Sequence, residues 1–316
     1  MTTEHALTAH GLRKRYADLP ALDGVDLQVP AGSIHGLLGP NGAGKSTAVK
    51  AMATLIDFDA GTVRVAGLDV RTQARRVRER IGVVGQHPAV DEILGGRQNL
   101  VMFGRLYGLS KIDARRRADT LLAQFDLTAA ADRAVATYSG GMRRRLDIAA
   151  GMIVAPAVLF LDEPTTGLDP RARNEVWRSV RGVAEQGTTV LLTTQYLDEA
   201  DQLATGITVL HHGRIAASGT PDALKRQIGG DRVSLALAAG EPLEPLADRL
   251  RSAVGAPVTV DADARRVTVE VGAVVTTLAA VVRTLDDLGI TPEDLQLRRP
   301  TLDEVFLALT DKEAGR

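Results

Sequence analysis

A glycine-rich segment near residue 40 carries the residue types that bind phosphate. It fits the pattern G-x-x-x-x-G-K followed by Ser or Thr, with an apolar run at 33–38 before it and a helical pattern from residue 48 after it. Its residues are Gly39, Pro40, Asn41, Gly42, Ala43, Gly44, Lys45, Ser46 and Thr47. The glycines let backbone N–H groups approach phosphate oxygens, and the helix N-terminus favours negative charge. We expect a nucleoside triphosphate here, with Lys45 at its β- and γ-phosphates and the Ser46 hydroxyl on Mg²⁺.

Two adjacent acidic residues end an apolar run of strand length. The run at 157–161 is followed by Asp162 and Glu163, and then by a proline. In a chain with a phosphate-binding segment, a strand that delivers two carboxylates to its carboxyl end is what a Mg²⁺-dependent nucleoside triphosphatase requires. We expect Asp162 to hold the metal through water, and Glu163 to orient or deprotonate the attacking water.

A second segment is also suited to an anion. Ser139 precedes a helical pattern, as an N-cap residue does, and Gly140 and Gly141 open that helix. A serine and two glycines at a helix N-terminus form a further anion site. One triphosphate cannot easily need both sites, so the function of the second site requires a separate explanation.

The elements that must position these residues alternate between strands and helices. Strand patterns lie at 6–35, 61–67, 81–86, 157–164, 188–194 and 207–219. Helical patterns lie at about 99–128, with a break at 108–110, and at 174–185. The first two strand segments alternate as antiparallel strands do, whereas the later apolar ones are typical of buried strands. We therefore predict an α/β fold with a parallel core sheet and an antiparallel β patch.

The pattern changes beyond residue 229. Strands are predicted at 232–238, 257–261, 266–271 and 295–298, and helices at 243–254 and 274–288. This β-α-β-β-α-β order predicts a small α+β domain of the split βαβ type. A last helix should follow Pro300, with Thr301 and Glu304 as a capping box. We therefore divide the chain into a nucleotide-binding domain at 1–228 and an accessory domain at 229–316.

Composition limits the classes of partner. The chain has 316 residues and a net charge of −1, so nothing attracts it in bulk to nucleic acid or to an anionic membrane, and no nucleic-acid partner is expected. The absence of cysteine excludes disulfides and thiolate metal sites. No apolar run reaches the roughly 20 residues that cross a bilayer, and the N-terminus lacks a secretory signal pattern. Any membrane role therefore requires a separate chain.

In this order the motifs resemble those of ATP-binding subunits of ABC transporters, from residue 5 to about residue 225. The phosphate-binding segment is similar to the Walker A motif, and residues 159–163 to Walker B. Gln86 matches the Q-loop, Ser139 opens the match to the signature motif, and Gly167-Leu168-Asp169 matches the D-loop. Tyr16 stands where the family has an aromatic residue that stacks on adenine. The resemblance implies an ABC cassette in which a helical subdomain carries the signature.

The resemblance also implies ligands and partners. ATP and Mg²⁺ would bind, with Asp169 among the nucleotide-binding residues and Gln86 close to the γ-phosphate and the metal. Two cassettes would form an ATP-dependent homodimer, head to tail, in which Ser139, Gly140 and Gly141 of one subunit close over the γ-phosphate held by the other. A separate polytopic membrane permease would receive the signal from Gln86 and hold the chain at the cytoplasmic face of the cell membrane.

Two positions depart from the family pattern. Met142 stands where glutamine is usual in the signature, and Gln195 takes the position of the switch histidine. A glutamine amide can donate to the γ-phosphate, but it cannot titrate near pH 6.5 or shuttle a proton. We therefore hypothesise that Glu163 is the general base and that Gln195 senses and positions the γ-phosphate.

Residues 193–203 and 302–306 resemble most closely the daunorubicin/doxorubicin-resistance ATP-binding subunits of actinobacterial drug exporters. This resemblance implies ATP-driven export of a hydrophobic, anthracycline-like compound through a separate membrane subunit. One alternative is an exporter of a lipid, a polysaccharide or a peptide. A second is an ABC-type ATPase without a transporter, acting on ribosomes or DNA. Such proteins should carry two cassettes in one chain or a long coiled-coil insertion, and the sequence has neither.

Overall fold

The computed structural model describes residues 5–227, 230–271 and 274–306, and the chain forms two compact units. The units are Met1–Pro221 and Asp222–Arg316. The division falls after the first residue of α8 (Pro221–Gln227), so this helix groups mostly with the C-terminal unit. The boundary predicted from the sequence, after residue 228, lies slightly later in the chain.

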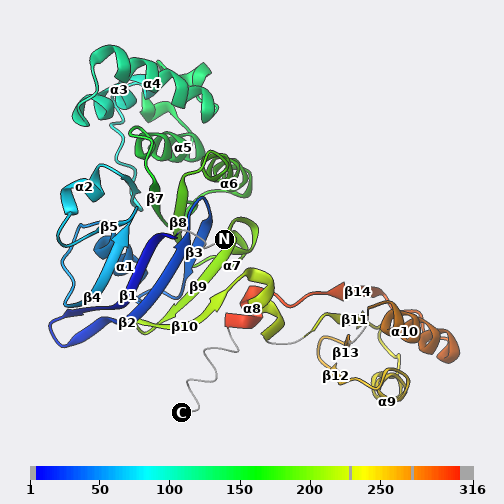
Figure 1. Ribbon diagram of the computed structural model, residues 1–316. Helices are drawn as coiled ribbons and strands as arrows, with labels where there is room; N and C mark the ends of the chain where they lie inside the picture. The colour runs from blue at the N-terminus through cyan, green and yellow to red at the C-terminus, as the bar shows by residue number, and fades with distance from the viewer. Residues whose placement is uncertain (1–4, 228–229, 272–273, 307–316) are drawn as a thin grey trace. The chain divides into compact units, whose positions relative to one another are not determined.

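An antiparallel sheet of strand order β2-β1-β4-β5 forms one layer of the first unit (Figure 1). Its strands are β1 (His5–Tyr16), β2 (Leu19–Pro30), β4 (Ala60–Val65) and β5 (Leu68–Asp69). Alternate residues such as Leu7 and Ala9 are fully buried, and they pack in one core with Val49 and Met52 of α1 (Lys45–Met52). The predicted antiparallel patch is confirmed, and it packs against the helix that follows the phosphate-binding segment.

A second sheet has the strand order β10-β9-β3-β8-β7-β6 and forms the centre of the unit. Its strands are β3 (Ile34–Leu38), β6 (Ile81–Val84), β7 (Val158–Asp162), β8 (Thr189–Thr194), β9 (Gly206–His211) and β10 (Arg214–Gly219). All neighbours pair in parallel except β9 and β10, which form the expected hairpin. Because β8 pairs with both β3 and β7, the carboxyl ends of these three strands meet at one edge of the sheet.

On the side opposite α1, the sheet is covered by α5 (Gly140–Gly151), α6 (Pro170–Glu185) and α7 (Leu197–Leu203). Helices α3 (Gly96–Leu106) and α4 (Lys111–Gln124) pack against each other and against α5, farther from the sheet (Figure 1), while α2 (Ala74–Arg78) precedes β6. Strand β7 separates the two cores, because Leu159 and Leu161 join the cluster that includes α3–α6 whereas Val158 and Phe160 join the cluster around α1. The predicted break at 108–110 is confirmed between α3 and α4.

The helix expected near residue 174 begins earlier, at Pro170. Asp169 caps it, since its carboxylate accepts a hydrogen bond of 2.8 Å from the backbone N–H of Ala172. An aspartate N-cap followed by proline at the first helical position is a strong helix start. The predicted start is later because apolar periodicity identifies only the part of α6 that is buried, and its buried residues begin at Val176.

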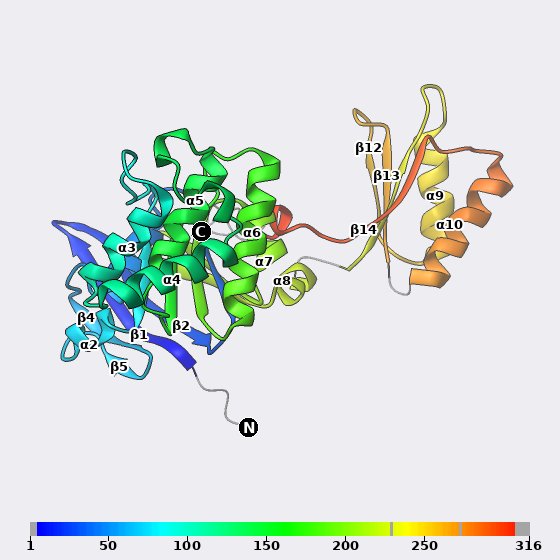
Figure 2. The same ribbon diagram turned by 90° about the horizontal axis from the view of Figure 1, so that it is seen from above.

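The C-terminal unit has the predicted β-α-β-β-α-β order (Figure 2). Its elements are β11 (Arg232–Ala236), α9 (Leu243–Val254), β12 (Val258–Asp261), β13 (Arg266–Glu270), α10 (Val274–Leu288) and β14 (Asp294–Arg298). The sheet is antiparallel, in the order β12-β13-β11-β14, and one face packs against both helices. The expected capping box is present, with both hydrogen bonds between Thr301 and Glu304 at 3.3 Å.

One buried histidine lies in the central strand of the first unit. His35 on β3 has its Nε2 2.9 Å from the Thr208 hydroxyl, and burial lowers its pKa from 6.5 to about 4. The folded protein therefore keeps this ring neutral at pH values where the unfolded chain already binds a proton.

We predict that acid destabilises the protein in part through His35. As the pH falls from about 6.5 to 4, the protonated unfolded state is favoured by up to about 3 kcal/mol, at 1.36 kcal/mol for each pKa unit. Urea unfolding at several pH values in this window should give a steeper loss of stability for the native chain than for His35→Gln, which cannot titrate. Equal slopes for the two proteins would contradict this assignment.

Candidate functional site

The loop between β3 and α1 is shaped by glycines that no other residue could replace. Gly39 and Gly44 have φ angles of 154° and 106°. A Cβ on Gly39 would collide with the carbonyl oxygen of Leu210, and one on Gly44 with that of Ala21. The loop therefore turns tightly over the sheet and leads directly into α1, whose first residue is Lys45.

Lys45 turns its ammonium group back over this loop. Its Nζ donates to the carbonyl oxygens of Gly39 at 2.8 Å and Pro40 at 3.1 Å, and the residue is only 5% exposed. Burial lowers its pKa, while the nearby carboxylates of Glu163 and Asp162 favour the charged form. The ammonium group thus lies over the loop, where phosphate oxygens could take the place of these two carbonyl oxygens as acceptors.

The Asp162 carboxylate accepts hydrogen bonds from hydroxyl groups of two other elements. Ser46 Oγ on α1 lies 3.3 Å from Asp162 Oδ1, and the Thr193 hydroxyl on β8 donates to the same oxygen. Hydroxyl and carboxylate oxygens are the ligands that Mg²⁺ prefers, so this pair of side chains fits the predicted metal position. Thr193 is not among the residues predicted for the site; its place near the carboxyl end of β8, a strand with the sequence TVLLTT, was the available signal.

Glu163 follows in an unusual backbone conformation. Its φ is 47°, a left-handed geometry that costs a non-glycine residue on the order of 1–3 kcal/mol. The backbone N–H donates to the carbonyl of Thr193 at 3.1 Å and to its hydroxyl at 3.2 Å, and the carboxylate accepts from the Thr166 hydroxyl at 3.2 Å. These hydrogen bonds hold the carboxylate toward the phosphate loop.

A cavity of about 310 Å³ lies between the phosphate loop and Glu163. It is lined by Tyr16, Ala21, Asn41, Gly42, Gly44, Lys45, Ser46, Thr47, Gln86 and Glu163. Tyr16 is 48% exposed at the end of β1, where its ring can cover a base, and Gln86 is exposed just beyond β6. Gly39, Pro40 and Ala43 form the base of the loop, and Asp162 lies behind Ser46. The structure thus brings together predicted residues from four separate motifs.

Ser139, Gly140, Gly141 and Asp169 do not line this cavity. Ser139 Oγ caps α5 by accepting from Met142 N at 3.2 Å, and Asp169 caps α6. A Cβ on Gly141 would lie 2.9 Å from the Cβ of Ala172, so this glycine permits close packing of α5 on α6. Within one chain, the signature glycines therefore belong to a helix start away from the nucleotide cavity.

Gln195 lies at the same edge of the sheet but outside the cavity lining. It is the residue after β8, whose Thr194 pairs with Leu38 of β3 and whose Thr193 pairs with Asp162 of β7. Its side chain is exposed. The strand order therefore explains how Gln195 comes to lie between the phosphate loop and the acidic pair.

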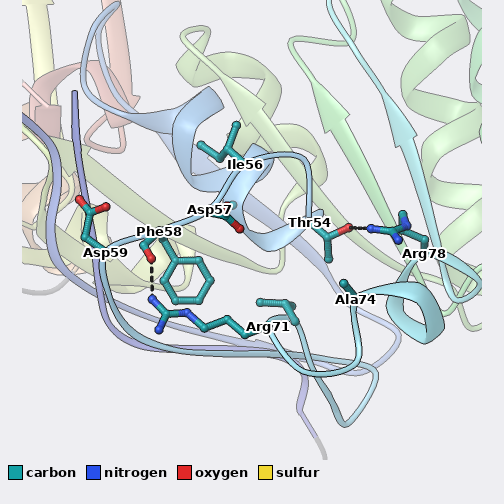
Figure 3. A pocket seen from close by; sticks show the side chains of 10 residues that line it. Thr54, Ile56, Asp57, Phe58, Asp59, Arg71, Ala74 and Arg78 are labelled. Carbon is teal, nitrogen blue, oxygen red and sulfur yellow. Dashed lines mark hydrogen bonds between the residues drawn. The ribbon is translucent and has the colours of Figure 1, made fainter. Parts of the chain in front are cut away.

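A larger cavity, of about 530 Å³, is formed by residues of segments 51–59 and 70–78 (Figure 3). The Arg71 guanidinium lies over the Phe58 ring at 4.1 Å and donates to the Phe58 carbonyl, and Arg78 donates to the Thr54 hydroxyl at 3.3 Å. Its two arginines thus already have partners, and none of the predicted site residues lines it. We therefore assign the nucleotide site to the smaller cavity, which several of the predicted site residues line.

The fold and this site define the class of the protein. A glycine-rich loop after one parallel strand and an acidic pair after another, at one sheet edge, make a P-loop nucleoside triphosphatase. The ABC transporter family matches residues 22–166. The chain is 56% identical to daunorubicin resistance ATP-binding protein DrrA2 of Streptomyces coeruleorubidus, over 97% of this chain and 95% of that protein. It is 50% identical to daunorubicin/doxorubicin resistance ATP-binding protein DrrA of Streptomyces peucetius, over 98% and 93%.

A solved structure supports the fold. CbiO1 of Clostridium perfringens, described as part of the ABC transporter complex CbiONQ, matches with a TM-score of 0.66 and 26% identity, over 71% of this chain and 93% of that one. The chain therefore belongs to the family of ABC transporter ATP-binding proteins that includes these drug-resistance proteins. It binds ATP and is an ATPase, as the motifs predicted.

We predict that Thr193 is required for turnover. Thr193→Val removes both the donor to Asp162 and an acceptor for Glu163 N, so ATP hydrolysis should fall about tenfold, which corresponds to about 1.4 kcal/mol of barrier. Thr193→Ser keeps the hydroxyl and should restore most of the rate. Hydrolysis should be measured beside equilibrium ATP binding, which we expect to change little. A Val variant with the native rate would rule out this role.

Proposed function

We propose that this chain is the ATP-hydrolysing subunit of an exporter and that it drives a hydrophobic, anthracycline-like drug through a separate polytopic permease. The observation that supports this cargo is the likeness to proteins named for daunorubicin resistance, which extends through the C-terminal unit and not only through the cassette. Among the described residues, no helix has the length and apolar character of a membrane span, so the proposal assigns the translocation path to a partner. The permease would hold the chain at the cytoplasmic face of the cell membrane.

The active unit in this proposal is an ATP-dependent homodimer. Support comes from the N-terminus of α5, where Ser139 and Gly140 are exposed and lie outside the nucleotide cavity of their own chain. A head-to-tail dimer gives these groups a ligand, because their backbone N–H groups would face the γ-phosphate bound by the partner subunit. ATP then joins the two subunits, and its hydrolysis lets them separate.

Mg²⁺ fits the hydroxyl and carboxylate oxygens of Ser46 and Asp162, and in this proposal Gln86 completes its protein contacts. When bound, Mg²⁺ would neutralise charge on the β- and γ-phosphates. Lys45 adds positive charge at the same phosphates, and the loop N–H groups orient them. Tyr16 stacks on the adenine and fixes the other end of the nucleotide.

Glu163 is proposed as the general base, and Gln195 as the residue that senses the γ-phosphate. The Glu163 carboxylate lines the cavity and is oriented by Thr166, so it can take a proton from a water beside the γ-phosphate. Gln195 lies at the adjacent strand end and can donate an amide hydrogen bond. Asp169, which caps α6, is proposed to place the D-loop at the dimer contact.

The C-terminal unit is proposed as an accessory domain that braces the dimer or docks on the permease. It has its own hydrophobic core, with Leu235, Val267 and Leu250 fully buried, so it folds around contacts of its own. The proposal follows the boundary predicted at 228/229, close to the division after Pro221.

Affinity capture of the tagged chain from detergent-solubilised membranes of its host tests the class of partner. We expect a polytopic protein to be recovered, and daunorubicin to change the ATPase rate of the recovered complex. A chain lacking 231–316 should still bind ATP but should recover less permease. Ribosomes or other non-membrane partners in place of a permease would contradict the exporter proposal, and rates that respond to a lipid or peptide but not to the drug would change its cargo.

Substitutions at two positions separate the proposed roles at the γ-phosphate. Glu163→Gln should lower ATP turnover by about 10²-fold or more, as expected for loss of a general base, while ATP still binds. Gln195→Ala should lower turnover less, and Gln195→His should introduce a pH dependence near 6.5 that the native amide lacks. Turnover and its pH profile from 5.5 to 8 are the measurements. Native turnover in Gln195→Ala would show that this side chain has no sensing role.

A further inference from the structure

Arg144 on α5 is a buried charged side chain for which the roles proposed above provide no function. It is 5% exposed, and its guanidinium group reaches the ends of two neighbouring strands. Nε donates to the carbonyl of Pro164 at 2.8 Å, and Nη2 donates to that of Asp162 at 3.0 Å. Nη1 donates to the carbonyl of Gly85 at 2.6 Å. One planar fork thus donates to three backbone acceptors from two strand ends.

These three carbonyls flank the residues proposed to act on the γ-phosphate. Asp162 and Pro164 lie on either side of Glu163, whose backbone has the left-handed φ of 47°. Such a conformation persists only where surrounding contacts hold it, and Arg144 supplies two of them. Gly85 immediately precedes Gln86, so the same guanidinium also fixes the start of the Q-loop.

Asp147, one turn further along α5, holds the other end of that loop. Its Oδ1 accepts from the backbone N–H of Ala89 at 2.8 Å, and its Oδ2 lies 3.2 Å from Nη1 of Arg144. Both side chains are buried. Helix α5 therefore contacts the Q-loop on both sides of Gln86, through an ion pair in which Arg144 also bonds three carbonyl groups and Asp147 one backbone N–H.

We propose that Arg144 and Asp147 form a positioning pair that couples the N-terminus of α5 to Gln86 and Glu163. This inference rests on the proposed roles of those two residues. Ser139 caps α5 and Arg144 lies in the second turn of the same helix, so a displacement of its N-terminus moves the guanidinium group as well. Closure of α5 over a second subunit's phosphate thereby sets the carboxylate and the Q-loop in their catalytic placement, and neither member of the pair touches the nucleotide.

The next residue offers a matched control. Arg145 is also buried on α5, at 8% exposure, and also forms hydrogen bonds and an ion pair. Its donors reach the Phe125 carbonyl at 2.8 Å and Glu175 at 3.1 Å, both within the helical layer. It is equal to Arg144 in residue type and similar in burial, but it does not contact the strand ends.

The test compares Arg144→Lys with Arg145→Lys in the full-length chain. A lysine ammonium keeps the charge but cannot reach three carbonyls in a fixed fork. We expect Arg144→Lys to lower kcat by about tenfold to a hundredfold, as for a catalytic group displaced by about 1 Å, with KM and ATP binding within about twofold of native. Arg145→Lys should keep kcat within about threefold even where it lowers Tm as much.

Equal loss of kcat in both variants at matched Tm, or native kcat in Arg144→Lys, would overturn the positioning role. If Arg144→Lys does not fold, Asp147→Asn provides the same comparison, because it weakens the ion pair while Oδ1 can still accept from Ala89. Glu163→Gln serves as the reference for the catalytic assignment. If Glu163→Gln turns over ATP at the native rate, the proposed base is wrong; if only Arg144→Lys does, the positioning pair alone is wrong.

Discussion

Parallel pairing of β8 with both β3 and β7 is the constraint on which the site depends. It brings Ser46 and Asp162, which are 116 positions apart, within 3.3 Å of each other. Val190 and Leu192 of β8 face one core and Leu191 faces the other, so a slip by one residue would exchange the side chains that the two cores receive. The position of the acidic pair relative to the phosphate loop is therefore fixed by the packing of a strand that supplies neither.

Much of this arrangement could be predicted from the sequence, because its signals are local. The glycine pattern around Lys45 identifies the phosphate loop, and an apolar run ending in Asp162 and Glu163 identifies a strand that delivers carboxylates. Periodicity also predicts the order of elements in the C-terminal unit, where buried Val267 and Val269 of β13 alternate with more exposed neighbours. In each case the residues that determine the structure lie within about one element of one another.

The remainder depends on contacts between distant segments. The sequence places Thr193 near the end of a strand, but it does not name Asp162 as the partner of its hydroxyl, since that contact exists only once β8 lies beside β7. Arg144 stands in a run of three arginines, and only the fold distinguishes the one that reaches the strand ends from its neighbour, which turns into the helical layer. The left-handed backbone of Glu163 is likewise imposed by tertiary hydrogen bonds and not by residue type.

The signature glycines meet two requirements that the structure separates. Gly141 is required within the chain, because a Cβ there would press on Ala172 and push α5 away from α6. Gly140 is exposed and is required less strictly, since a Cβ would meet only the end of the flexible Leu168 side chain at 3.2 Å. Intrachain packing thus accounts for the second glycine but not for the first. In the proposed dimer a phosphate held by the partner subunit would account for both, and because α5 also carries Arg144, the helix that would meet this phosphate is the one that hydrogen-bonds the backbone on both sides of Glu163.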